Sequence, residues 1–178
     1  LIFNYFYMIF FGNFLNLLCQ EIFTLCHYNR AMDLMEAQEY QDAREKFLNL
    51  GNYQDSATNA QECLYQPAMK AMEMGDNLLA IDYFKQLGEY RDSTLKLQMA
   101  YYAAADQYFA EADYDTAAEY YLLAGDYSDA FRRATGCLYA PAVDAMEAGE
   151  YAQAVEMFSK ISAYEDAQEL MEKCIYLQ

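Results

Sequence analysis

A repeat of 37 residues runs through most of the chain and constrains its fold more than any other feature. Four copies follow one another without a gap, and repeats of this length are typical of stacked helical units. The units are 28–64, 65–101, 102–138 and 139–175, with a fifth beginning at 176. The matching columns that we assign a structural role are Ala43, Ala80, Ala117 and Ala154; Phe47, Phe84, Tyr121 and Phe158; and Asp55, Asp92, Asp129 and Asp166.

Each unit is expected to contain two helices, of which the shorter second helix has the clearest pattern. Its apolar residues are spaced by 3, 4 and 3 positions, as in one stripe of an amphipathic helix. They are Tyr40, Ala43, Phe47 and Leu50 in the first unit, and Tyr151, Ala154, Phe158 and Ile161 in the fourth. An acidic residue precedes each stripe, where the helix dipole favours it, and Gly51, Gly88 and Gly125 supply left-handed residues that end the helix.

The longer first helix is expected to begin at the aspartate column and to span about 20 residues, ending near Gly75, Ala112 or Gly149. Aspartate is a preferred N-cap, and Asp166 with Glu169 also fits a capping box. Pro67 and Pro141 lie inside this helix. We expect a continuous helix with a kink there, the alternative being a helix that restarts near Tyr65 and Tyr139.

The alternation of small and aromatic columns resembles the tetratricopeptide repeat. The residues that carry the resemblance best are Gly149, Tyr151, Ala154, Phe158 and Ile161, and it covers residues 28–175. The period differs from the usual 34 residues of that family, and aspartate stands where the family commonly has proline. The Gly-x-Tyr-x-Asp connector is similar to a variant found in tandem in Firmicutes proteins, often after a membrane segment or a zinc ribbon.

The resemblance implies an all-α fold, a right-handed solenoid of helix-turn-helix repeats with a concave groove that binds proteins or peptides. We therefore expect a non-catalytic scaffold, with two alternatives. One is an accessory or sensor module of a larger enzyme or regulator, an option that arises because the chain starts at Leu1 and stops inside a fifth unit, which we take as a sign of a fragment. The other is a purely structural spacer.

The charge and the residue types of the chain argue against several classes of function. A formal net charge of −17 disfavours nucleic acid, which requires clustered Lys and Arg. No Ser-His or Cys-His catalytic pair can form within the repeats, because the only histidine, His27, precedes them. No cofactor motif is found in the repeats either. His27, Cys19 and Cys26 fit no common zinc spacing, so no metal is expected.

Residues 1–27 lie before the repeats and are apolar, with no charge in residues 1–20. Three interpretations stay open: a membrane anchor, which would be the only contact with a membrane; translated upstream or frameshifted sequence; and a helix that caps the first repeat.

The partner is expected to be a protein or peptide that is basic, because the third and fourth units carry net charges of −5 and −6. The first helices line the concave side in the family, so the candidate partner-binding residues are Tyr65, Tyr102, Tyr139, Asp106 and Asp144. Packing between units is the alternative role for the tyrosines. The column Cys63, Cys137 and Cys174 is expected to hold buried, reduced thiols, which favours the cytoplasm.

Overall fold

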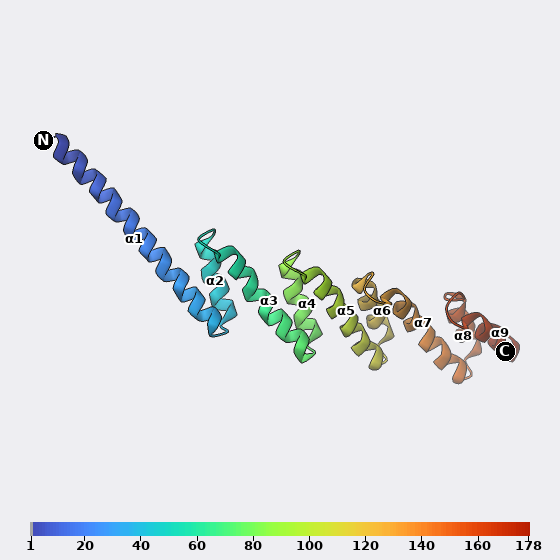
Figure 1. Ribbon diagram of the computed structural model, residues 1–178. Helices are drawn as coiled ribbons and strands as arrows, with labels where there is room; N and C mark the ends of the chain where they lie inside the picture. Colours follow the sequence, from blue (N-terminus) through green and yellow to red (C-terminus); the bar gives the residue numbers. More distant parts are fainter. Residues whose placement is uncertain (1) are drawn as a thin grey trace. The chain divides into compact units, whose positions relative to one another are not determined.

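The computed structural model describes residues 2–178, with side chains from residue 11 onward, and this part of the chain is helical without any strand (Figure 1). Its helices are α1 (Ile2–Glu36), α2 (Tyr40–Leu50), α3 (Ser56–Met74), α4 (Asn77–Leu87), α5 (Ser93–Ala110), α6 (Tyr114–Ala124), α7 (Ala130–Glu147), α8 (Tyr151–Ser159) and α9 (Ala167–Leu177).

The helices pack in neighbouring pairs within two compact units, Leu1–Met69 and Lys70–Gln178. In the first unit α1 packs against α2, and the start of α3 contributes Ala60 and Cys63 to the same core. In the second unit each helix from α4 to α9 packs against the next one along the chain. The sequence prediction of an all-helical fold is therefore confirmed.

The second helices α2, α4, α6 and α8 begin at the predicted column. Asp76 and Asp113 cap α4 and α6, since each carboxylate accepts a hydrogen bond of 3.2 Å from the backbone N–H three residues on. Three of these helices end at Gly51, Gly88 and Gly125, with φ of 58°, 57° and 60°. Their ψ values of −118°, −122° and −126° belong to the first central position of a type II′ turn, and not to a left-handed helix cap.

The first helices α3, α5 and α7 run 18 or 19 residues, as predicted, and pass through Pro67 and Pro141 without a break. A restart at Tyr65 or Tyr139 is therefore wrong. The capping prediction is also wrong in its detail: Asp92, Asp129 and Asp166 stand at N-cap positions, but none of their side chains bonds to a helix N–H. The capping box of Asp166 and Glu169 is absent for the same reason.

The core is made of the small and aromatic columns. All eight residues of the alanine column and of the aromatic column that follows it are 0% exposed: Ala43, Ala80, Ala117, Ala154, Phe47, Phe84, Tyr121 and Phe158. Small residues on one helix let the aromatic ring of the next approach closely, and this alternation fills the space between neighbouring helices.

Helix α1 continues unbroken from the apolar N-terminal segment into the first repeat (Figure 1). The side chains of residues 11–23 are exposed, whereas Thr24 and Tyr28 are half-buried, and the capping interpretation stays a prediction. Leu1 and the side chains of residues 2–10, which also belong to the proposed anchor, lie outside the described residues. None of the helices described has the length and hydropathy required for crossing a membrane.

Candidate functional site

The first candidate site is the tyrosine column of the first helices, in which the hydroxyl groups of Tyr102 and Tyr139 bond to the aspartates of the following connector. Tyr102 donates to Asp129 Oδ1 over 2.5 Å, and Tyr139 donates to Asp166 Oδ1 over 2.5 Å. This bond raises the pKa of Tyr139 to about 12, and it also raises the pKa of Tyr102 while lowering that of Asp129. Asp129 and Asp166 therefore tie a first helix to the connector that follows it, and neither side chain caps the helix that it precedes.

The rings of these tyrosines pack edge-on between the second helix and the connector of their own repeat. The centroid of Tyr102 lies 5.4 Å from that of Tyr121 and 5.5 Å from that of Tyr127. The centroid of Tyr139 lies 5.9 Å from that of Phe158, edge-on, and 5.5 Å from that of Tyr164, where the rings are tilted. These contacts correspond to the packing alternative, and contact with a partner remains a prediction for the half-buried Tyr65, Tyr102 and Tyr139.

Asp106 belongs to a polar network in the third repeat. The buried hydroxyl of Tyr121, which replaces the phenylalanine of the other repeats, donates to Asp106 Oδ1. Arg133 Nη1 lies 3.7 Å from Asp106 Oδ1, and Arg133 Nε lies 3.6 Å from Asp129 Oδ2. Burial, followed by the bond to Asp106, raises the pKa of Tyr121. The structure thus links Tyr102 and Asp106 through Asp129 and Arg133, whereas Asp144 is exposed on α7 outside the network.

The second candidate site is a groove of about 340 Å³ beside α7 and α8, which we call the C-terminal groove. Its apolar lining includes Leu138 and Pro141 on α7 and Met157 on α8. Asp113 and Asp115, at the start of α6, add two exposed carboxylates to the lining. The cation that lines the groove, Lys160, is paired with Glu156 over 3.2 Å. The groove therefore combines an apolar lining with exposed negative charge.

Two residues that line the C-terminal groove stand where the preceding repeat has tyrosine. One repeat earlier, the positions of Leu138 and Met157 hold Tyr101 and Tyr120. These rings lie 5.9 Å apart, and Tyr120 also contacts Tyr108 at 5.2 Å. The two rings therefore contact one another between α5 and α6, whereas Leu138 and Met157 put smaller or more flexible side chains at the equivalent positions of α7 and α8.

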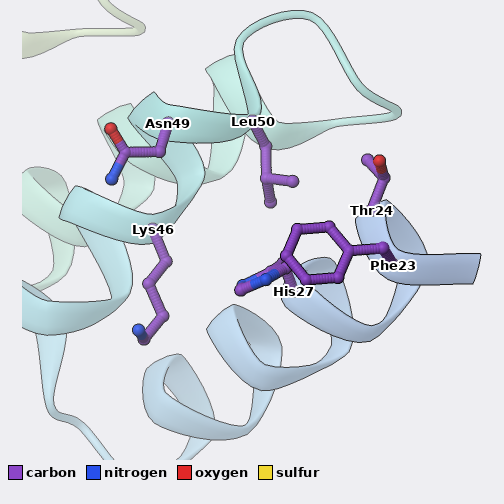
Figure 2. Close-up of a pocket in the computed structure, with 6 residues that line it drawn as sticks. All are labelled: Phe23, Thr24, His27, Lys46, Asn49 and Leu50. Atoms are coloured by element: carbon purple, nitrogen blue, oxygen red, sulfur yellow. The ribbon is translucent and has the colours of Figure 1, made fainter. Parts of the chain in front are cut away.

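The first repeat has a groove at the same repeat positions, with a different chemistry (Figure 2). This N-terminal groove, of about 410 Å³, has His27, Lys46 and Asn49 where the C-terminal groove has Leu138, Met157 and Lys160. In Figure 2 the rings of Phe23 and His27 lie against one another on α1, at a centroid distance of 4.2 Å, with Leu50 pointing toward them from α2. No carboxylate lines this groove, so its charge is opposite to that of the C-terminal groove.

The thiols divide into two classes. Cys63, Cys137 and Cys174 are buried and free, whereas Cys19 and Cys26 are exposed and free. Burial raises the pKa of Cys63 and Cys137 to about 11, which suppresses the reactive thiolate. Across the residues that the structure describes, no His, Cys, Asp and Glu side chains gather in a group that could hold a metal ion.

Sequence reasoning placed the tyrosine column correctly on the first helices but missed both grooves. It searched for columns that stay the same, and the grooves lie where columns differ. The change from Tyr101 to Leu138 and from Tyr120 to Met157 was visible in the sequence, and comparing aligned columns for loss of volume would have located the C-terminal groove. The tyrosine–aspartate bonds left a signal too, since both columns recur at a constant separation.

Comparison of the chain with protein-family models, with curated proteins and with solved structures finds no match.

Proposed function

We propose that the chain is a non-catalytic scaffold that binds an extended protein segment in its C-terminal groove. The occupant carries an aliphatic side chain, which lies against Leu138, Pro141 and Met157, next to a Lys or Arg that pairs with Asp113 or Asp115. The observation that carries the proposal is the groove itself, which combines an open apolar surface with exposed carboxylates.

Charge complementarity supports a basic partner. Besides Asp113 and Asp115, the third and fourth units carry the largest negative charge of the array, −5 and −6. Such a field favours approach of a cationic segment, and the contribution weakens as salt screens it. The apolar lining adds affinity that salt does not remove.

The resemblance to the tetratricopeptide repeat extends the proposal to the arrangement of the units. It implies that the helix pairs stack as a right-handed solenoid and that the partner lies on the concave side. The buried thiols support a reducing compartment such as the cytoplasm, in which Cys63, Cys137 and Cys174 stay reduced.

Selection of random peptides on the full chain tests the proposal. We expect enriched peptides to share an aliphatic residue next to Lys or Arg, and to bind at least about tenfold more weakly to the Leu138→Tyr/Met157→Tyr variant. That variant copies Tyr101 and Tyr120 of the preceding repeat, so it should fold while filling the groove. Asp113→Asn removes one carboxylate of the groove while keeping a side chain that can cap α6. It should weaken peptide binding and make that binding less dependent on salt.

The matched control is Leu95→Tyr, which adds a ring at a site on α5 that is 49% exposed. It should leave peptide affinity unchanged. Enrichment of acidic peptides, or equal binding to the wild type and the filled-groove variant, would overturn the proposal.

A further inference from the structure

Helix α1 exposes a straight line of apolar side chains before it enters the first repeat. Leu15, Leu18, Ile22 and Leu25 are 46%, 41%, 54% and 42% exposed, and Asn29 continues their spacing of 3 and 4 residues. An average spacing of 3.5 residues keeps such a line on one stripe of a helix and is the seam pattern of a coiled coil. We call these five residues the α1 seam.

The α1 seam faces away from the rest of the first unit. The residues of α1 that join the core shared with α2 include Tyr28, Ala31 and Leu34, and none of them belongs to the seam. Phe23, Thr24 and His27, which line the N-terminal groove, also lie outside it. Figure 1 shows α1 continuing well beyond the end of α2.

The residues of the seam specify the kind of helix that fits it. With Leu15 at position a of the heptad, Ile22 and Asn29 also fall at a, while Leu18 and Leu25 fall at d. Isoleucine at a with leucine at d favours two parallel strands, and a single asparagine at a fixes the register by pairing with itself. An antiparallel arrangement centred on Ile22 would place the Asn29 amide against Leu15, without a polar partner.

We propose that α1 forms a parallel, in-register, two-stranded coiled coil with α1 of a second copy of this chain. Met8 and Phe11 continue the seam spacing toward the N-terminus in the sequence, which lengthens the stripe. Residues 1–20 carry no charge, so like charges do not oppose pairing along this stretch. Burial of the four half-exposed side chains on each helix would favour association through the hydrophobic effect.

The acidic repeats oppose the association of the two copies. Each copy carries a net charge of −17, all of it beyond residue 20, and a parallel arrangement brings together the ends of the two α1 helices that lead into the acidic repeats. Their repulsion weakens the dimer, and added salt should strengthen it by screening that repulsion. This salt dependence is opposite to that expected for a basic peptide in the C-terminal groove, so failure of either proposal is distinguishable from failure of the other.

Sedimentation equilibrium of the full chain without detergent tests the proposal. At tens of micromolar we expect about twice the chain mass of 20.6 kDa, and Ile22→Lys should weaken association at least tenfold. Leu17→Lys is the matched control, because Leu17 is 59% exposed on the same helix outside the seam and should leave association unchanged. Circular dichroism checks that both variants keep the helicity of the wild type.

Oxidation of a Leu25→Cys variant, made with Cys19→Ser and Cys26→Ser, tests the orientation. A parallel, in-register pair brings the two introduced thiols together and gives a disulfide-linked dimer, which the same chain with leucine at this position cannot form. A monomer at every concentration, or equal loss of association in Ile22→Lys and Leu17→Lys, would overturn the coiled coil. Association with neutral lipid vesicles in place of dimerisation would identify the stripe as a membrane-binding surface instead.

Discussion

The hydroxyl of Tyr139 joins the first helix of the fourth repeat to the connector that follows it, through its 2.5 Å bond to Asp166. The same bond recurs one repeat earlier between Tyr102 and Asp129. Aspartate before a helix suggests a cap when the sequence is read alone, because capping needs only local residues. A tyrosine 27 residues away is a partner that local sequence rules do not consider, and it competes successfully for the carboxylate.

Removing this hydroxyl with Tyr139→Phe should lower the free energy of unfolding by about 0.5–1 kcal/mol near neutral pH, because a half-exposed bond is partly replaced by water. The pKa of Tyr139 is raised from 10.0 to about 12, so the folded state keeps the proton longer than the unfolded state does. The stabilisation is therefore fully present below pH 10 and is lost as the pH rises toward about 12.

Urea unfolding of the wild type and Tyr139→Phe at a series of pH values measures this loss. The difference in the free energy of unfolding between the two proteins should shrink above pH 10, while ionisation of the remaining tyrosines affects both proteins alike. Tyr176→Phe, at a side chain that is 90% exposed, is the control and should be neutral. A difference that stays constant or grows through this pH range would contradict the assigned bond.

At the scale of the helices, the periodicity of the sequence predicted where nearly all helices begin and end. The second helices, the glycines that end them and the long first helices all follow from spacing and turn chemistry. The turn geometry did not follow, since Gln54, Arg91, Ser128 and Glu165 adopt φ values of 45–54° although none is glycine. Each lies inside a connector closed by a backbone hydrogen bond, as from Ser56 N–H to Tyr53 O at 3.0 Å. Tertiary packing imposes this conformation, and side-chain preference does not reveal it.

The prolines also show that packing can override the local preference of a residue. Pro141 lies inside α7, where it cannot donate to the carbonyl of Cys137, yet the helix continues. Its column holds Ala104 in α5, which is 0% exposed, so alanine fits the equivalent space. Packing against neighbouring helices must therefore offset the lost hydrogen bond.

We expect Pro141→Ala to raise the free energy of unfolding by about 1–2 kcal/mol, less than the full cost of an interior proline because α7 has already adapted to it. The reverse change, Ala104→Pro, should lower the free energy of unfolding by about 3 kcal/mol or more. Urea midpoints of the two variants measure both effects. Destabilisation by Pro141→Ala would show that packing requires the backbone shape that proline imposes.

At the scale of the whole molecule, charge and hydrophobicity are separated along the chain. The first 20 residues are uncharged, whereas the repeats carry the acidic side chains and bury several small columns and one aromatic column per unit. The core around Ala31 and Phe47 is formed by residues of α1, α2 and α3, and the core around Ala154 and Phe158 by residues of α7, α8, α9 and the connector between α8 and α9. Stability should accordingly be distributed over local clusters that depend mainly on adjacent helices.

Deletion of residues 139–175 tests this distribution because it removes one full repeat without disturbing the register. Leu138 is joined to Tyr176, so the shortened chain ends in Ala130–Leu138 followed by Tyr-Leu-Gln, equivalent to the Ala167–Leu177 helix that ends the full chain. We expect the remaining repeats to stay helical, with a lower urea midpoint and a smaller dependence of the unfolding free energy on urea, because less surface is exposed on unfolding. The rate of amide hydrogen exchange around Ala31 and Phe47 should change little, because their cluster contains no residue of the deleted repeat. Loss of all cooperative unfolding after the deletion would instead mean that the array folds only as one indivisible core, and the nearest-neighbour account of its stability would be wrong.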